Sequence, residues 1–277
     1  MKKSAFQDEL RFAQWFAGRA GEQIRRAVGS QTGTAKADGT PVTDTDREVN
    51  DRFIRLARWR FPGDDVLGEE ASNSAGAAAS GRTWVIDPID GTQYFLLGVP
   101  VHMVSIALVD RGTPVVAVAH NPSTSEFFWA TRGGGAYRDG VRLSVSARDG
   151  RREVAIVRGS GVLQGVGGLA SGHLLAVDWR SGCSTVPYST ALPTVFTGCK
   201  IAEGSWDGDL YDGAGAHDVA AVCLLVREAG GKVTDARGRD QRYDRDVSGC
   251  VLSNGLIHED LLRHWAPVGD GRVLRAC

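Results

Sequence analysis

The sequence predicts an α/β fold with an N-terminal α+β part and a C-terminal α/β part. Three patterns support this prediction: apolar residues at helical spacing near the N-terminus, hydrophobic strands joined by short turns near the middle, and strands alternating with helices after about residue 145. A chain of 277 residues that is 42% hydrophobic has enough apolar side chains for about two domains. We therefore expect one domain at residues 1–145 and a second at residues 146–277.

Two helices are expected near the N-terminus. Apolar residues recur every three or four positions across residues 6–28, which is typical of an amphipathic helix. The run TDRE at residues 45–48 matches a capping box, and it precedes a second helical pattern that ends before Phe61. Asp46 therefore has a purely structural alternative, because an acid in the first turn of a helix is stabilised by the macrodipole.

Strands and short turns follow these helices. Residues 84–86 read as a buried strand, and residues 104–109, 115–119 and 127–129 as an antiparallel meander that ends at a glycine-rich turn at residues 133–135. The three glycines lack the spacing and the following helix of a phosphate-binding loop. We therefore interpret them as a turn.

The C-terminal part alternates between strands and helices. Strands are expected at residues 154–157, 174–177 and 232–234, and helices at residues 194–202, 218–228 and 258–265. The glycine pair at residues 230–231 ends the second of these helices.

Two acids follow the apolar strand at residues 84–86. Asp87 and Asp90 lie where Pro88 cannot continue a central strand and Gly91 permits a turn, so both carboxylates are expected to leave the sheet together. Two hard oxygen donors at one strand end suit Mg²⁺, Mn²⁺ or Ca²⁺. The alternative is an ordinary turn, because Asp-Gly is also a common hairpin sequence.

Three further acidic clusters favour a metal site over an ordinary turn. They are Asp44 with Asp46, Glu69 with Glu70 in a Gly-Glu-Glu run, and Asp218 at the start of an expected helix. If Glu69 and Asp218 converge on the pair at the strand end, four carboxylates repel one another unless cations lie between them. Two or three divalent cations that carry water would form a site for displacement at phosphorus. This pattern predicts hydrolysis of a phosphate ester.

Gly91 and Thr92 follow the acids and offer donors to a phosphate group. Backbone N–H groups and a hydroxyl bind phosphate without adding negative charge. The Thr92 hydroxyl is also expected to accept a hydrogen bond from the attacking water while it donates to Asp46. The alternatives are that Thr92 only satisfies the turn, that Lys36 is solvated instead of attracting phosphate, and that His217 is a structural histidine.

The composition limits the partners that the chain can have. The formal net charge is −1 and the pI about 6.6, so neither nucleic acid nor an anionic membrane is expected as a partner. The longest apolar stretches are shorter than the roughly 20 residues that a membrane-spanning helix needs. Five cysteines without a Cys-x-x-Cys pair favour a reducing, cytoplasmic location over a disulfide framework or a zinc site.

These motifs resemble the inositol monophosphatase superfamily of lithium-sensitive, magnesium-dependent sugar phosphatases, which includes members similar to histidinol-phosphate phosphatase. The resemblance spans nearly the whole chain and rests on residues 68–70, 84–92 and 217–231, in that order. Residues 84–92 carry the W-x-x-D-P-[IL]-D-G-T signature of the superfamily, and Phe95 follows it as expected. The resemblance implies a layered α/β/α/β/α sandwich that forms a homodimer.

The resemblance also implies the metal ligands. Glu69, Asp87 and the carbonyl of Ile89 would hold one ion. Asp87, Asp90 and Asp218 would hold a second. The implied cofactor is Mg²⁺, as two or three ions, with Mn²⁺ as an alternative. In this assignment the N-terminal domain supplies most of the ligands, and the C-terminal domain supplies Asp218.

The remaining implied roles concern the reaction. Asp46 and Thr92 match the pair that orients the attacking water, so they are predicted to be catalytic together with Glu69. Gly91 and Thr92 match the phosphate-binding turn. Lys36 lies near a lysine of the superfamily and is a candidate substrate contact.

Departures from the superfamily pattern concern the substrate. His217 stands where tryptophan is usual, and Tyr211, followed by Asp212, stands where inositol phosphatases place a glutamate that binds the sugar. The usual small-residue turn before the penultimate helix is replaced by ALPT at residues 191–194. We therefore treat Tyr211, Asp212 and His217 as candidate substrate contacts, and inositol phosphate is not the assumed substrate.

The sequence therefore predicts an enzyme that hydrolyses a small phosphate monoester, such as a sugar, cyclitol or amino-alcohol phosphate, by direct attack of metal-activated water. One alternative is a nucleotide 3′-phosphatase of the adenosine 3′,5′-bisphosphate type. Another is a phosphosugar-binding protein that keeps the fold without activity. A structural calcium-binding domain is a further alternative, but the acids lack the twelve-residue loop of an EF-hand.

Overall fold

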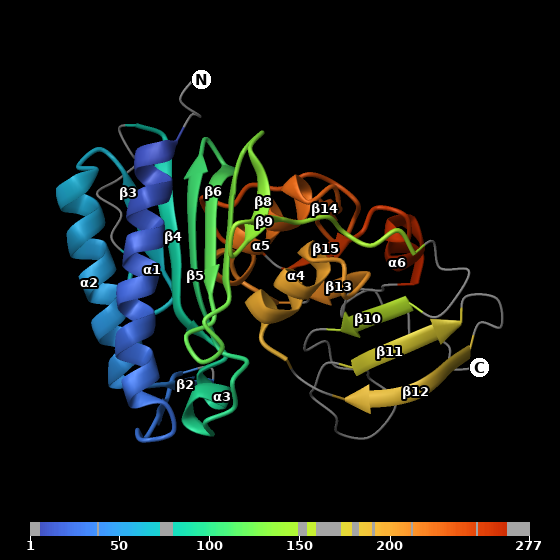
Figure 1. Cartoon of the computed structure of the whole chain (residues 1–277), viewed down its shortest axis with the longest axis horizontal. Helices are drawn as coiled ribbons and strands as arrows, with labels where there is room; N and C mark the ends of the chain where they lie inside the picture. Colours follow the sequence, from blue (N-terminus) through green and yellow to red (C-terminus); the bar gives the residue numbers. More distant parts are fainter. Residues whose placement is uncertain are drawn as a thin grey trace.

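The computed structural model confirms a mixed α/β protein (Figure 1). It describes residues 6–37, 39–72, 80–148, 154–158, 173–178, 183–189, 192–211, 213–247 and 249–264. Within this part of the chain, no helix is long and apolar enough to cross a membrane.

A seven-stranded sheet forms the N-terminal half, with strand order β3-β4-β5-β6-β7-β8-β9. The parallel pair β3–β4 lies at one edge, and every other neighbouring pair is antiparallel. The strands are β3 (Asp65–Gly68), β4 (Arg82–Asp90), β5 (Met103–Asp110), β6 (Thr113–His120), β7 (Phe127–Thr131), β8 (Gly135–Arg138) and β9 (Val141–Arg142). The predicted meander and its glycine turn are confirmed by β5, β6 and β7 and the turn that follows them.

Three helices and a small two-stranded sheet accompany the large sheet. The elements are α1 (Gln7–Ala27), β1 (Thr34–Ala35), β2 (Pro41–Val42), α2 (Asp44–Arg60) and α3 (Thr92–Leu96). The two predicted N-terminal helices are confirmed, although α2 begins earlier than expected. Its N-cap is Thr43, and its capping box pairs Thr43 with Asp46. The TDRE run at residues 45–48 is thus already helical, because a capping residue two positions upstream offers the same side-chain chemistry.

A six-stranded sheet forms the C-terminal half, with strand order β12-β11-β10-β13-β15-β14. Its strands are β10 (Val154–Arg158), β11 (His173–Asp178), β12 (Cys183–Ser189), β13 (Gly208–Tyr211), β14 (Lys232–Thr234) and β15 (Cys250–Ser253). The helices of this half are α4 (Thr194–Ala202), α5 (Ala216–Glu228) and α6 (His258–His264). The predicted helix at residues 194–202 and the strand at residues 232–234 agree with the structure.

The large sheet separates two hydrophobic cores. Helix α1 contacts β5 and β6 on one side of the large sheet, whereas α5 contacts β4, β5 and β6 and also β14 and β15 of the second sheet (Figure 1). Neighbouring residues of β4 point into different cores: Trp84 and Ile86 belong to the core beneath α1 and α2, and Val85 to the core around α4 and α5. Strand β4 is buried on both faces, so its polar end is fixed by packing on either side.

Strand β4 continues through Pro88, contrary to the expectation that the proline ends it. The register to β5 shifts between Asp87, which pairs with Ser105, and Asp90, which pairs with Met103. The extra residue forms a bulge, and a bulge accommodates a proline because the ladder hydrogen bond is already interrupted there. Asp87 and Asp90 therefore both remain in β4, at its irregular end.

Aromatic side chains fill the core beneath α1 and α2. Phe53 is fully buried, with its ring centroid 4.8 Å from Phe16, 5.8 Å from Phe12 and 5.9 Å from Trp84. Tilted and edge-to-face pairs at these separations add to the hydrophobic gain of burial. This packing fixes α2 on the large sheet, and α2 carries Asp46 in its first turn.

The variant Phe53→Ala tests how strongly this core holds the fold. Removing a buried ring leaves a cavity, so we expect the free energy of unfolding to fall by roughly 3–5 kcal/mol in urea denaturation. The control is Trp59→Ala on the same helix, where the side chain is 79% exposed and the expected change is within about 0.5 kcal/mol. Equal effects of the two variants would contradict this description of the core.

Candidate active site

Asp87 and Asp90 lie at the irregular end of β4. Both are almost fully buried, with 2% and 6% of their surface exposed. The backbone N–H of Val195, in the first turn of α4, donates to Asp90 Oδ2 at 2.8 Å. This contact ties the strand end of the N-terminal half to a helix of the C-terminal half.

Asp218 approaches the same point from α5. It lies in the first turn of the helix, and the N–H of the N-cap residue Gly215 donates to its Oδ2 at 2.6 Å. A carboxylate in this position is favoured by the helix dipole. His217 Nε2 lies 3.5 Å from the same oxygen. Asp218 was expected to be the first residue of this helix. It lies in the first turn, but α5 begins two residues earlier, at Ala216.

The three aspartates converge although Asp218 lies far from the other two in sequence. One carboxylate oxygen each from Asp87, Asp90 and Asp218 lies within 4.8 Å of the other two. In the part of the chain that the structure describes, this is the one group of three acidic, histidine or cysteine ligands with such spacing. The predicted convergence of these residues therefore exists in the structure.

Burial, together with the charges of neighbouring acids, raises the pKa of all three carboxyl groups. Burial is the main cause for each of them, because it penalises the ionised form. Glu69, Asp90 and Asp218 add to the effect on Asp87, and Asp218 adds most of the charge repulsion on Asp90. Ionising the whole cluster at neutral pH therefore requires positive charge nearby.

Glu69 lies beside this group, in the loop after β3. Its backbone N–H donates to the carbonyl of Ile86 at 3.1 Å, which holds the loop against β4. Glu69 is not part of the 4.8 Å group, but it raises the pKa of each of the three aspartates. The structure therefore places all four predicted acids in one region.

Lys36 is the cation that balances the Glu69–Glu70 pair. Its Nζ lies 2.6 Å from Glu69 Oε1 and 2.6 Å from Glu70 Oε1. Burial alone lowers the pKa of Lys36, but hydrogen bonds and charge attraction from both glutamates outweigh burial and raise it. Lys36 is therefore charged and held at the site by carboxylates. Glu70 belongs to the acidic Gly-Glu-Glu run of the sequence, but no role as a metal ligand or in the reaction was predicted for it.

Two buried oxygens test whether the site fits divalent cations. Asp87 Oδ1 and Glu69 Oε2 are buried and accept no hydrogen bond from the described residues. A buried carboxylate oxygen without a donor is costly, and such oxygens are normally satisfied by protons, water or metal ions. The donor set consists of carboxylate and carbonyl oxygens, which are the ligands of Mg²⁺, Mn²⁺ and Ca²⁺. The residues present therefore fit the implied cofactor.

Asp46 and Thr92 meet next to this cluster. Thr92 Oγ1 lies 3.3 Å from Asp46 Oδ1 and 3.0 Å from the carbonyl of Ile89, so its single proton has two possible acceptors. Asp46 also accepts from the N–H and the hydroxyl of Thr43. Asp46 thus belongs to the capping box of α2, which is a structural role. It also contacts Thr92, which its predicted catalytic role requires.

Burial sets the protonation of Asp46. It is fully buried, and burial raises its pKa from an ordinary value of 3.8 to about 6, with smaller contributions from Glu70 and Glu69. Hydrogen bonds from Thr43 act in the opposite direction. The Asp46 carboxyl group is therefore half protonated at about pH 6.

Gly91 forms the turn between Asp90 and α3. Its φ of 88° is a left-handed value that favours glycine. A Cβ at this position would lie 2.5 Å from Pro193 Cγ, so any larger residue also collides with the N-terminus of α4. Residues 91 and 92 therefore keep their backbone close to the acidic cluster.

The candidate substrate contacts are placed differently from one another. His217 lies beside Asp218 with 28% of its side chain exposed. Tyr211 is buried in the core, where its hydroxyl contacts Thr197 Oγ1 and donates to the carbonyl of Thr194 at 3.0 Å. This burial leaves Tyr211 no exposed face for a substrate, and its contacts support the first turn of α4. Asp212 lies outside the described residues.

Two contributions to the site were missed by the sequence analysis. The N–H of Val195 binds Asp90, but a backbone donor leaves no side-chain signal in a sequence. Pro193 packs against Gly91 and fixes the approach of α4. The ALPT run at residues 191–194 marked this position as unusual, although its contact with Gly91 depends on tertiary structure.

Comparison with known proteins identifies the family. The model of the inositol monophosphatase family matches residues 7–268. A histidinol-phosphatase from Mycobacterium tuberculosis is 36% identical over 262 residues, which are 92% of this chain and 96% of that protein. An inositol-1-monophosphatase from Mesorhizobium japonicum is 34% identical over 258 residues, covering 89% of this chain and 92% of that protein.

Solved structures agree with these relatives. An IMPase from Thermotoga maritima superposes with a TM-score of 0.79 at 28% sequence identity, covering 93% of this chain and 96% of that chain. The chain therefore belongs to the inositol monophosphatase family. It is a phosphomonoesterase of that family, and its substrate is a small phosphate ester.

The raised pKa of Asp46 predicts a pH dependence of stability. Without divalent cations, the Asp46 carboxyl group has a pKa of about 3.8 in the unfolded chain and of about 6 in the folded chain. The wild type should therefore lose stability relative to Asp46→Asn as the pH rises from about 4 to 6, by roughly 3 kcal/mol in total, and the difference should level off above that range.

Urea denaturation across this pH range checks the prediction. The control is Asp240→Asn, because 91% of the Asp240 side chain is exposed. A stability difference between wild type and Asp46→Asn that stays constant, or that shrinks as the pH rises, would show that Asp46 is not a buried acid with a raised pKa.

Proposed function

We propose that the protein is a Mg²⁺-dependent phosphatase that hydrolyses a sugar, cyclitol or amino-alcohol phosphate by direct attack of water. The observation that carries this proposal is the 4.8 Å cluster of oxygens from Asp87, Asp90 and Asp218. Membership of the inositol monophosphatase family supports it further. No covalent phosphoenzyme is required, because the cluster contains no side-chain nucleophile other than its metal-binding carboxylates.

The proposed ligands form two overlapping sets. Glu69, Asp87 and the carbonyl of Ile89 would hold one cation. Asp87, Asp90 and Asp218 would hold another, and the orphan oxygens of Glu69 and Asp87 support this division. When bound, Mg²⁺ or Mn²⁺ would lower the pKa of water and neutralise the negative charge that develops on the leaving oxygen.

The chain itself orients the attacking water through Thr92. Its hydroxyl oxygen accepts a hydrogen bond from the water while its proton points to Asp46 Oδ1, 3.3 Å away. A proton released from the water then passes through Thr92 Oγ1 to Asp46. The pKa of about 6 at Asp46 suits this role, because a general base works best when its pKa is near the working pH.

Other residues hold the substrate. The backbone of Gly91 and Thr92 is proposed to bind the phosphate group, because these residues directly follow Asp90 in the chain and backbone N–H groups bind phosphate without adding negative charge. Lys36 adds a positive charge beside Glu69. His217 is the proposed contact to the rest of the substrate, since it lies next to Asp218 and is partly exposed.

The proposal extends to architecture and assembly. The contacts of α5 with both sheets support a five-layer α/β/α/β/α sandwich. The division into domains at residues 1–145 and 146–277 is supported by the separate strand sets of the two sheets. We also propose a homodimer, as the family resemblance implies.

A panel of phosphate esters tests the proposed function. Relatives that cover most of this chain include a histidinol-phosphatase, inositol-1-monophosphatases and a fructose-1,6-bisphosphatase/inositol-1-monophosphatase. We expect phosphate release in the presence of Mg²⁺ from at least one sugar, cyclitol or amino-alcohol phosphate. Release from adenosine 3′,5′-bisphosphate alone would favour the nucleotide phosphatase, and release from no ester would favour a binding protein.

The variant Asp90→Asn tests the role of the acidic cluster. Asparagine keeps the size of the side chain and can still accept the hydrogen bond from Val195, but it removes one negative charge. We expect phosphate release to fall at least about a hundredfold, because charge stabilisation by bound cations contributes several kcal/mol. Asp240→Asn should retain full activity. Residual activity of Asp90→Asn within about tenfold of the wild type would contradict the proposed site.

A further inference from the structure

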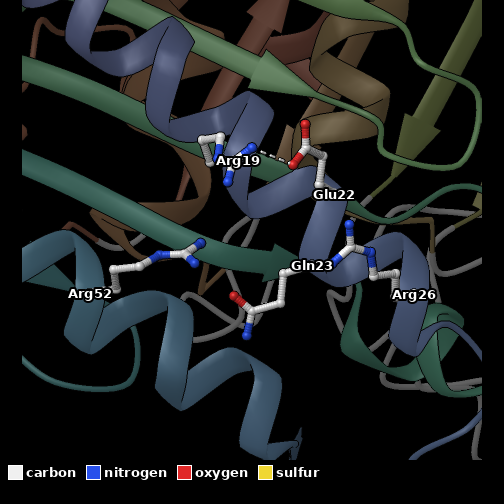
Figure 2. Close-up of a pocket in the computed structure, with 5 residues that line it drawn as sticks. All are labelled: Arg19, Glu22, Gln23, Arg26 and Arg52. Atoms are coloured by element: carbon white, nitrogen blue, oxygen red, sulfur yellow. Dashed lines mark hydrogen bonds and ion pairs between the residues drawn. The ribbon is translucent and has the colours of Figure 1, made fainter.

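A cavity lies between α1 and α2, and the residues that line it differ from those of the acidic cluster. It has a volume of about 340 Å³ and is lined by Arg19, Glu22, Gln23, Arg26 and Arg52 (Figure 2). The first four residues are spaced by three, one and three positions, which places them on one face of α1. Arg52 reaches toward them from α2 (Figure 2).

The acids near this cavity do not balance all of its arginines. Glu22 Oε2 pairs with Arg19 Nη1 at 2.8 Å, and both side chains of that pair are substantially exposed. Gln23 Nε2 donates to Glu48 Oε2 at 2.8 Å. Among the described residues, Arg26 has no carboxylate oxygen within 4.0 Å, so one guanidinium of the cavity is left for solvent or a ligand.

Arg52 adds a guanidinium to the wall of the cavity. Its Nη2 atom is covered by protein and donates to no acceptor in the described part of the chain, so the rest of the guanidinium is the part that can face a ligand. The guanidinium stacks on the ring of Phe16 at 5.3 Å, which fixes it in the wall of the cavity. Burial lowers its pKa, and the charges of Arg19 and Arg55 lower it further, against the opposing effect of Glu48. The position is therefore electropositive as well as unsatisfied.

We propose that the cavity between α1 and α2 is a binding site for a small anion that carries several phosphate oxygens. Guanidinium groups are planar forks that bind phosphate through paired, charge-assisted hydrogen bonds. The lining contains three guanidinium groups, of which that of Arg19 is paired with the carboxylate of Glu22, together with one amide and no lysine. Its volume lies at the lower end of the range for small-molecule sites.

This site is separate from the proposed active site. None of its lining residues belongs to the acidic cluster or to the Asp46–Thr92 pair. Arg52 nevertheless lies on the same helix as Asp46, six positions further along, which is about 9 Å in an α-helix. A bound anion would lie between the arginines of α1 and Arg52 of α2 and would reduce the repulsion between these positive charges.

Calorimetric titration with tripolyphosphate tests the proposal. The full-length protein is first dialysed free of divalent cations, so that no cation bound at the acidic cluster can hold tripolyphosphate there. We expect saturable binding of about one equivalent at low salt. Arg52→Gln should weaken binding at least about tenfold, because it removes a positive charge and the charge-assisted hydrogen bonds of a guanidinium that lines the cavity. Arg26→Gln should weaken it several-fold.

The matched control is Arg11→Gln. Arg11 is an arginine of α1 that pairs with Asp8 and does not line the cavity. It carries the same formal charge, so its replacement changes the net charge by as much as Arg52→Gln does. Binding by the Arg11→Gln variant should match that of the wild type. An equal loss in both variants would mean that attraction is diffuse and would overturn the site.

Other outcomes also overturn the proposal. They are the absence of saturable binding up to about 10 mM, unchanged affinity in Arg52→Gln, and saturable binding of a single-stranded oligonucleotide without binding of tripolyphosphate. Thermal melting checks that Arg52→Gln folds, since Arg52 packs on Phe16. If it does not fold, Arg26→Gln decides, and unchanged affinity in that variant overturns the site.

Discussion

The mutual repulsion of buried carboxylates is the constraint on which the rest of this structure depends. Asp87, Asp90 and Asp218 bring oxygens within 4.8 Å of one another, and burial together with neighbouring acids raises each pKa. Folding therefore concentrates negative charge that the protein alone does not neutralise. Cations that bind at this point would stabilise the folded state and at the same time create a site for phosphate.

The fold offsets part of this repulsion with fixed donors. The N–H groups of Val195 and Gly215 bind Asp90 and Asp218, and Lys36 lies between Glu69 and Glu70. Each donor comes from a different element, which explains why both halves of the chain are needed to assemble the cluster. Asp87 Oδ1 and Glu69 Oε2 are buried here and accept no hydrogen bond from the described residues. They identify where positive charge is still missing.

The parts of the fold that could be predicted from the sequence are those set by local patterns. The amphipathic spacing of residues 6–28 predicts α1, and α4 coincides with its predicted range. The signature at residues 84–92 predicts the acids that converge with Asp218. These features depend on residues that are close in sequence or on a motif that the family resemblance supplies.

The parts that could not be predicted depend on tertiary contacts. Pro88 continues β4 because a bulge against β5 removes the need for its missing N–H. Tyr211 looks like a substrate contact by position, but it is buried against α4. The capping residue of α2 is Thr43 and not Thr45. The two threonines have the same side-chain chemistry, so the sequence alone does not show which of them caps the helix.

Anomalous diffraction from crystals grown with Mn²⁺ would locate cations bound at the acidic cluster. We expect at least one Mn²⁺ peak within about 2.5 Å of carboxylate oxygens from Asp87, Asp90 and Asp218. Crystals that show Mn²⁺ only elsewhere on the molecule, or these carboxylates separated with no ion between them, would contradict it.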